Sequence, residues 1–398
     1  MSSPSQARRR QLRTWRPNPD GSGLLPIHAT DQGDEEPRCL VDLASNDYLN
    51  LAQHPELIEA ATEEIKRSGV GAGGSRLVSG SRPVHDQLEH QLAQWLNRDR
   101  VLLYPSGFQA NLAAVLALAD RHTPVLADRL CHHSLLTGVQ ASGGRLQRFA
   151  HNDLIDLNRK LERCRDRHPG QQPLVITESL FSMEGTSPNL SAMAELCASH
   201  AARLLVDEAH ALGVLGDGGR GLSHALPHKA VTMLSGTFGK AFGSGGAFLA
   251  CDADLGETLL QTSGAFRYTT ALAPSLAAAA LAALTLMQRH PHWSEELMAT
   301  SQQWRSALAA AGWTRPGGAG PILPLVIGTD QAALDHQQTL EAAGLLSIAI
   351  RPPTVPEGTA RLRLVVRRLL PDGTLDTLLQ ALSDSQHARH SIKGIPNH

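Results

Sequence analysis

An aspartate and a lysine 33 positions apart have neighbours that suit the binding of an aromatic aldehyde. Asp207 follows the apolar run 204–206 and precedes His210, whereas Lys240 lies among small residues in the segment 235–243. A lysine amine forms Schiff bases with aldehydes, and a carboxylate beside a pyridine nitrogen keeps that nitrogen protonated. The pair therefore favours chemistry on pyridoxal 5'-phosphate (PLP).

Other interpretations of these residues are structural or concern nucleotides. A lysine is most often a solvated surface charge, and an aspartate after a strand is most often a turn or cap residue. A P-loop ending at Lys240 would need glycine at Leu234 and serine or threonine at Ala241, so it is excluded. The segment 216–221 matches G-x-G-x-x-G, but no helical pattern follows it, which favours a loop over a dinucleotide site.

The composition limits the class of protein. A chain of 398 residues suits one large domain and a smaller one. The net charge of −2 gives no general attraction to nucleic acid or membrane, so neither is expected as a partner. Five scattered cysteines predict reduced thiols in a cytoplasmic protein. The longest apolar run, 276–287, is too short to span a bilayer, and the arginine-rich start lacks the apolar segment of a secretory signal.

Short apolar runs alternate with amphipathic segments, which predicts an α/β domain with a mostly parallel sheet. Strands are expected at 101–104, 125–127, 174–177, 204–206, 231–234 and 247–250. Helices are expected at 88–96, 109–119 and 277–288. Because the second helix follows Ser106-Gly107-Phe108, its N-terminus offers backbone N–H groups to a phosphate.

Four segments are expected along the chain: an N-terminal arm (1–50), a large PLP-binding domain (51–288), a small C-terminal α+β domain (289–384) and a tail (385–398). In the small domain, strands are expected at 324–327, 345–350 and 360–366, and helices at 332–343 and 375–382. Leucines at 362 and 364 alternate with arginines, so Arg361 and Arg363 should lie on the face of the sheet away from the core.

Seven motifs, in the expected order, together resemble the α-oxoamine synthases, a branch of the fold-type-I PLP enzymes. They are Ser45–Leu49, Gly71–Arg76, Ser106–Phe108, Asp128–Ser134, Phe181–Gly185, Asp207–His210 and Thr237–Lys240. The resemblance implies the fold-type-I transferase fold, with a large domain around a mostly parallel sheet and a smaller C-terminal α+β domain. One departure is Asn50, where the family commonly has glycine; asparagine tolerates a left-handed backbone better than most residues.

The stretch 350–363 is most similar to members of this family that condense L-alanine with a pimeloyl thioester, carried on acyl carrier protein or on coenzyme A. Glycine-using members share the core motifs and are an alternative. A cofactor-binding but inactive partner subunit is another alternative, although the presence of Lys240, Asp207, His210 and His132 together argues against it.

The resemblance also implies roles for individual residues. Lys240 is expected to carry the Schiff base and to remove the Cα proton, Asp207 to pair with the ring nitrogen, and His132 to stack on the ring and meet the acyl substrate. The remaining cofactor-binding residues implied are Gly107, Phe108, Ser182, His210, Thr237 and Thr270. Thr270, with Thr269, is implied to reach the phosphate of a second subunit, so a homodimer with a shared active site is expected.

Substrate-binding candidates lie near both ends of the chain. Asn46 and Arg363 are the candidates for the alanine carboxylate, because arginine binds carboxylates in bidentate geometry. Arg361 shares the face of Arg363, and a structural ion pair is an equal alternative for it. Thr354 and Arg13 are weaker candidates for the pimeloyl portion. No metal is expected, since neighbouring side chains in Cys131-His132-His133 point in different directions.

Overall fold

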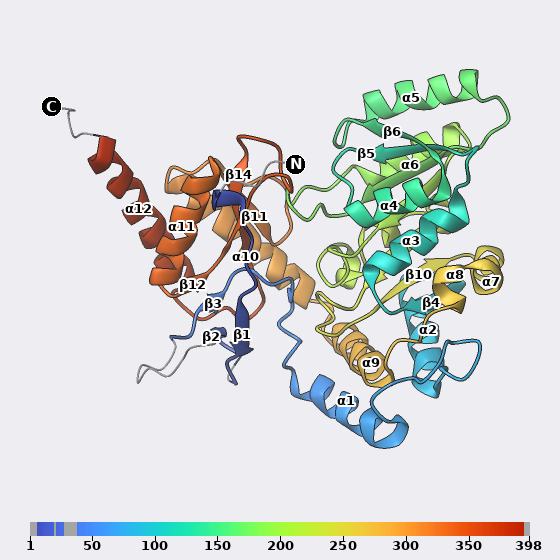
Figure 1. Ribbon diagram of the computed structural model, residues 1–398, viewed down its shortest axis with the longest axis horizontal. Coiled ribbons are helices and arrows are strands. Elements are labelled where there is room, and N and C mark those ends of the chain that lie inside the picture. Colours follow the sequence, from blue (N-terminus) through green and yellow to red (C-terminus); the bar gives the residue numbers. More distant parts are fainter. Residues whose placement is uncertain (1–5, 20, 28–37, 394–398) are drawn as a thin grey trace. The chain divides into compact units, whose positions relative to one another are not determined.

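The computed structural model describes residues 6–19, 21–27 and 38–393, and of 385–393 only the backbone (Figure 1). The chain forms two compact units. The large unit comprises Leu49–Ser182 and Thr186–Glu296. The small unit comprises the described parts of Met1–Tyr48 and Leu297–His398, together with Met183–Gly185. The segment up to Tyr48, expected as an arm, therefore groups with the C-terminal residues.

The large unit is built on a seven-stranded sheet in the order β4-β10-β9-β8-β7-β5-β6 (Figure 1). Only β10 is antiparallel to its neighbours β4 and β9; β9, β8, β7, β5 and β6 run parallel. The strands are β4 (Arg100–Tyr104), β5 (Pro124–Asp128), β6 (Arg145–Phe149), β7 (Leu174–Glu178), β8 (Arg203–Asp207), β9 (Met233–Thr237) and β10 (Ala247–Cys251). The expected α/β class with a mostly parallel sheet is thus confirmed.

Strand β6 was missed from the sequence, for a physical reason. Arg145, Leu146 and Arg148 are exposed on this edge strand, and only Phe149 is fully buried, so no apolar run marks it. The central strands β5 and β7 are buried along their whole length, and their apolar runs revealed them. Strand β9 begins two residues later than predicted, at Met233.

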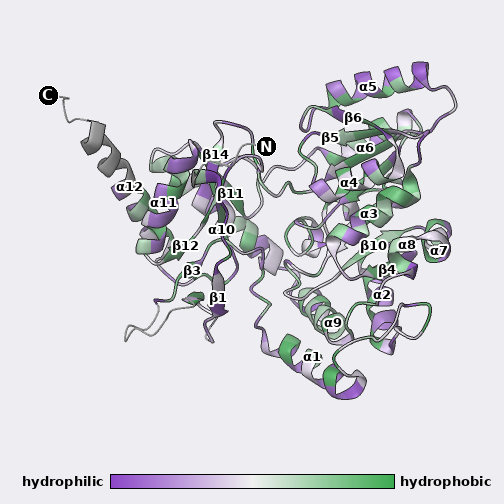
Figure 2. Ribbon diagram, in the orientation of Figure 1, coloured by the Kyte–Doolittle hydropathy of each residue, from purple (hydrophilic) through white to green (hydrophobic). Residues whose placement is uncertain are grey.

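Helices cover the sheet and turn polar faces outward, as the purple outer side of α5 shows (Figure 2). They are α1 (Pro55–Ser68), α2 (Pro83–Leu96), α3 (Gly107–Leu118), α4 (His133–Ser142), α5 (Leu154–Arg167), α6 (Leu190–Ser199), α7 (Ala253–Thr262), α8 (Gly264–Arg267) and α9 (Pro274–Arg289). The largest described core cluster lies between α3, α4 and the strands. Within the described residues, no helix has the length and apolar character needed to cross a membrane.

The small unit combines a three-stranded antiparallel sheet, β11-β14-β13, with helices. Its strands are β11 (Ile322–Gly328), β13 (Ile348–Ile350) and β14 (Ala360–Val365). A separate parallel pair joins β3 (Val41–Asp42) to β12 (Leu345–Leu346), which explains why the N-terminal segment groups here. A hairpin of β1 (Thr14–Pro17) and β2 (Leu24–Ile27) precedes it.

Three helices complete the small unit's elements: α10 (Trp293–Ala310), which contains the boundary between the units, α11 (Asp330–Ala342) and α12 (Thr374–Lys393). A tail was expected from residue 385, whereas the helical backbone of α12 continues to Lys393. Every residue of β14 is buried. The arginine side of this strand is therefore covered, and its charges must find internal partners.

Two turn predictions are confirmed by the backbone. Asn50 has φ 57°, the left-handed conformation that was expected to make asparagine acceptable there. The segment 216–221 contains only a short 3-10 turn, Asp217–Gly219, and no α-helix begins in it. At Gly221, with φ 82°, an added Cβ would lie 2.5 Å from Glu208 Oε2, so glycine is required for close packing on that carboxylate.

Candidate active site

Asp207 ends β8 at the carboxyl edge of the parallel strands, where α/β sheets bind ligands. Its side chain is only 6% exposed. Asn111 Nδ2 donates to Oδ2 at 2.7 Å and the backbone N–H of Ala209 donates to Oδ1 at 2.9 Å. Both oxygens are therefore oriented by donors, and the carboxylate keeps further acceptor capacity for the protonated nitrogen of a ring.

A chain of hydrogen bonds leads from Asp207 to His132. Asn111, on α3, donates from Nδ2 to Ser134 Oγ at 3.0 Å as well as to Asp207. Ser134 Oγ lies 2.7 Å from His132 Nδ1, which also accepts from the Ser134 N–H at 3.3 Å. Because Nδ1 is the acceptor, the neutral ring carries its proton on Nε2. The network thus sets the tautomer of His132.

The His132 side chain is exposed, yet neighbouring protein atoms remove part of the water around its ring. This desolvation lowers the pKa of His132, an effect that Asp207 opposes and Lys240 reinforces. His132 is therefore neutral at pH 7, as a ring that stacks on an aromatic cofactor should be. Asp207 and Lys240 both act electrostatically on His132, which indicates that the three residues belong to one site.

Lys240 lies in the turn that follows β9, whose Ser235 pairs with Asp207 of β8. The turn is closed by the Gly243 N–H, which donates to the Lys240 carbonyl at 2.8 Å. Gly243 has φ 60°, and an added Cβ would lie 2.5 Å from Ala52 N, so a side chain there would displace the turn. The Lys240 side chain is partly exposed.

The N-terminus of α3 suits a phosphate. Ser106 caps the helix by accepting from the Gln109 N–H at 3.3 Å. Across the described part of the chain, the amides of Gly107 and Phe108 have no hydrogen-bond acceptor. The site of a Cβ on Gly107 would lie 3.8 Å from the Thr237 side chain, whose hydroxyl donates to the Gly246 carbonyl at 3.0 Å and accepts from the Gly239 N–H at 3.2 Å. Because a phosphate oxygen only accepts, Thr237 would bind it by turning its hydroxyl proton away from that carbonyl. These residues fit the phosphate of PLP.

The other predicted cofactor residues belong to the same unit. His210 is buried, two residues after the buried Glu208, and Ser182 is half-buried. Thr269 is half-buried, whereas Thr270 is exposed just before α9. His133 is the exposed first residue of α4. Asn111 and Ser134 were not predicted, because no motif marks an asparagine inside a helix as a carboxylate partner.

Glu178 ends β7 directly beside Asp207 in the sheet register and is 3% exposed. Burial and the neighbouring Asp207 raise the pKa of Glu178 well above its ordinary value. Its Oε1 accepts from the His132 backbone N–H at 2.5 Å. Through this hydrogen bond Glu178 fixes the turn that carries His132.

We expect Glu178→Gln to gain stability relative to the wild type as the pH rises. Glutamate in the unfolded chain releases its proton near pH 4.3, roughly, whereas the folded protein raises the pKa of Glu178. Its contribution to the free energy of unfolding is therefore full below the unfolded pKa and is lost as the pH rises through the folded pKa, a loss that glutamine does not show. Urea unfolding of both PLP-saturated proteins at pH 5 and pH 8 measures the difference. Glu195→Gln, at an exposed position, is the control. A difference that does not grow with pH would contradict a raised pKa.

In the small unit, Arg363 and Asn46 lie together as predicted. Arg363 Nη2 donates to Asn46 Oδ1 at 2.8 Å, and the Tyr48 hydroxyl donates to the same oxygen at 3.3 Å. Arg363 is 4% exposed, and burial raises the pKa of Tyr48 to about 12. Arg361 instead donates to the Met183 carbonyl at 3.2 Å and pairs with Glu184 at 3.3 Å, which is the structural ion pair considered for it.

The remaining two substrate candidates are not brought together. Arg13 makes a bidentate ion pair with Glu341, at 2.6 and 3.0 Å, and lies over the Trp15 ring. Thr354 Oγ1 accepts instead from Arg10 Nη2 at 2.9 Å. Arginines recur throughout residues 8–16, so their spacing alone did not distinguish Arg10 from Arg13.

Comparisons with known proteins agree with this fold and site. The family model for class I and II aminotransferases matches residues 38–382. A serine palmitoyltransferase from S. paucimobilis, solved with a bound PLP–myriocin aldimine, superimposes with a TM-score of 0.86 at 25% identity, over 93% of this chain and 91% of that chain. The protein is thus a PLP-dependent enzyme of fold type I.

More similar relatives narrow the family. The 8-amino-7-oxononanoate synthase of Thioalkalivibrio sulfidiphilus is 40% identical over 96% of this chain and 99% of its own length, and that of Methylococcus capsulatus is 42% identical over 87% and 89%. A crystal structure of the Francisella tularensis synthase superimposes with a TM-score of 0.74 at 27% identity, over 89% and 99%. The chain belongs to the 8-amino-7-oxononanoate synthase family of PLP-dependent acyltransferases.

Proposed function

We propose that the protein condenses L-alanine with a pimeloyl thioester to give 8-amino-7-oxononanoate, carbon dioxide and free thiol, as a step of biotin biosynthesis. The observation that carries the proposal is the network Asp207–Asn111–Ser134–His132, which holds a buried carboxylate and a neutral histidine in one site with Lys240. The printed names of the relatives supply the product. In the reaction a bond forms between alanine Cα and the thioester carbonyl carbon, the thiolate leaves, and the alanine carboxylate departs as carbon dioxide.

PLP supplies an aldehyde for a Schiff base and a ring that accepts the electron pair released at Cα. Asp207 holds the proton on the ring nitrogen, which keeps the ring electron-poor. Gly107 and Phe108 would bind the phosphate through their backbone N–H groups, together with the Thr237 hydroxyl, while Ser182 and His210 would donate hydrogen bonds to the phenolic oxygen.

Lys240 and His132 act on the substrates. Lys240 Nζ would hold the aldehyde of PLP, and its amine, when not bonded to the cofactor, would remove the Cα proton of alanine and later return one. The neutral ring of His132 stacks on the cofactor, and its Nε2–H is available to the thioester carbonyl oxygen. Holding Nε2 as the donor is what the Ser134 contact contributes.

Arg363 and Asn46 bind the alanine carboxylate in this proposal. The guanidinium is buried and already oriented by Asn46, so less side-chain freedom is lost on binding. Arg13 and Thr354 are proposed for the pimeloyl portion, and the Arg10–Thr354 hydrogen bond adds Arg10 to that set.

We further propose a homodimer that shares its active sites, because the exposed Thr270 with Thr269 is available to a second copy's phosphate. The acyl donor is proposed to be carried on acyl carrier protein or coenzyme A. A cytoplasmic location agrees with cysteines that are all free, four of them buried.

Steady-state kinetics with matched substrates test the function. We expect turnover of alanine with pimeloyl thioester to exceed that of glycine with acetyl or succinyl thioester, and Arg363→Lys to raise KM for alanine about 10- to 100-fold by removing bidentate binding. Running pimeloyl-coenzyme A beside the pimeloyl-carrier protein identifies the donor. Preference for glycine, or no turnover by the PLP-loaded protein, would reject the proposal.

A further inference from the structure

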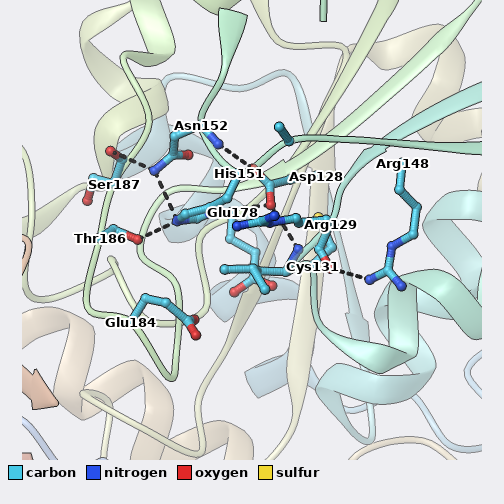
Figure 3. Close-up of polar contacts among 12 residues, drawn as sticks. Asp128, Arg129, Cys131, Arg148, His151, Asn152, Glu178, Glu184, Thr186 and Ser187 are labelled. Carbon is cyan, nitrogen blue, oxygen red and sulfur yellow. Dashed lines mark hydrogen bonds and ion pairs between the residues drawn. The ribbon is translucent and has the colours of Figure 1, made fainter. Parts of the chain in front are cut away.

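A second polar chain, separate from the cofactor residues, lies at the carboxyl edge of the large sheet. It joins Asp128, at the end of β5, through His151 to Thr186 (Figure 3). Asp128 Oδ1 lies 3.0 Å from His151 Nδ1, and His151 Nε2 lies 2.7 Å from Thr186 Oγ1. Asp128 is fully buried, and the His151 side chain is 14% exposed.

The partners of His151 determine how its ring is protonated. A carboxylate only accepts, so Nδ1 donates its proton to Asp128. Asn152 Nδ2, which only donates, lies 3.3 Å from His151 Nε2, so Nε2 is an acceptor. The Thr186 hydroxyl consequently donates to Nε2. His151 therefore links two specific partners in one orientation.

Each end of this chain holds a turn that carries a proposed cofactor residue. At one end, Asp128 accepts from the Leu130 N–H at 2.9 Å and from the Asn152 N–H at 2.8 Å, which fixes the turn leading to His132. At the other end, the Phe181 N–H donates to the Thr186 carbonyl at 2.9 Å, closing the loop that contains Ser182.

The same histidine also packs against that loop. The rings of His151 and Phe181 make a T-shaped contact, with centroids 4.4 Å apart and an interplanar angle of 89°. Phe181 is fully buried and directly precedes Ser182. His151 thus holds the base of the Ser182 loop by a hydrogen bond to Thr186 and by a ring contact to Phe181.

We propose that Asp128, His151 and Thr186 form a positioning relay that aligns Ser182 and His132 for PLP. The relay touches neither cofactor nor substrate; it sets the distance between the two turns from which Ser182 and His132 reach the ring. The proposal rests on the proposed roles of Ser182 and His132. Its prediction concerns the affinity and spectrum of PLP, which do not depend on the identity of the acyl substrate.

Thr186→Val tests the relay because it removes the hydroxyl and keeps the side chain's approximate size. We expect the dissociation constant for PLP to rise about tenfold, in the range found for lost buried hydrogen bonds and outer-shell partners. We also expect the visible absorbance maximum of the bound cofactor to shift and kcat to fall by a similar factor. Thr186→Ser, which restores a hydroxyl, should recover PLP affinity. His151→Asn, which keeps a donor towards Asp128 only, should behave like Thr186→Val.

Thr123→Val is the matched control. Thr123 lies just before the opposite end of β5, is 8% exposed, and its hydroxyl donates to Asp120 Oδ1 at 2.8 Å. The Thr123→Val substitution removes a comparable hydrogen bond next to the same strand. It should therefore lower the stability of the protein without changing its affinity for PLP or the spectrum of the bound cofactor. Equal PLP affinity and spectra in Thr186→Val, His151→Asn and Thr123→Val would overturn the relay. A wild type that binds PLP but does not use alanine and pimeloyl thioester would reject the function and leave this comparison intact.

Discussion

Lys240→Ala is expected to abolish the visible absorbance band of the Schiff base and to lower kcat on the order of 10⁴-fold or more. The loss is large because one amine is proposed both to bind the aldehyde and to move the Cα proton. The variant should still bind PLP non-covalently, since the backbone N–H donors of Gly107 and Phe108 remain. Absorbance spectra and single-turnover assays of the PLP-loaded variant measure the two effects separately.

The matched control for that experiment is Lys229→Ala, at an exposed lysine eleven residues earlier. It should retain the band and wild-type turnover. A band that persists in Lys240→Ala would show that another amine carries the cofactor, and the assignment of the site would then be wrong.

Asp207→Asn is expected to lower kcat about 10³-fold, the magnitude typical of losing one preorganised electrostatic partner. A neutral amide of the same shape no longer favours a proton on the ring nitrogen, so the ring accepts electrons from Cα less readily. PLP should remain bound, because its phosphate and Schiff-base contacts are unchanged. Rapid measurement of Cα–H exchange with deuterium in alanine, before any thioester is added, isolates the affected step.

Asp252→Asn provides the comparison. Asp252 caps α7 by accepting from the Leu255 N–H at 2.8 Å, and asparagine caps helices equally well. Wild-type exchange rates are expected for this variant. If Asp207→Asn exchanged the Cα proton as fast as Asp252→Asn, Asp207 would have no electronic role.

The local pattern of apolar residues was sufficient to predict much of the secondary structure of the large unit. The strands β5, β7 and β8 are buried on both faces of a parallel sheet, so they had to be continuous apolar runs, and these runs are readable. The exposed edge strand β6 carries polar residues and gave no such signal. Helix α3 was expected to begin at Gln109, and it begins two residues earlier, at Gly107.

Contacts between segments that are distant in the sequence could not be predicted from the sequence. Asn111 joins Asp207 to Ser134 and His132 across α3, α4 and β8, and no motif in the sequence links Asn111 to either side. The partners of the N-terminal arginines depended on the packing of the segment before Tyr48 with the C-terminal residues. For the same reason Arg13 pairs with Glu341, whereas Arg10 reaches Thr354.

The sequence by itself determined the type of chemistry, because Asp207 and Lys240 owe their reactivity to functional groups that are present in any conformation. It also indicated that Asn50 can accept a left-handed backbone, a local steric property, and the observed φ of 57° is left-handed. Only the tertiary structure decided the link from Asp207 through Asn111 to Ser134 and the raised pKa of Glu178. Those properties arise from burial and from hydrogen bonds between segments distant in sequence, and they come into being only when the chain is folded.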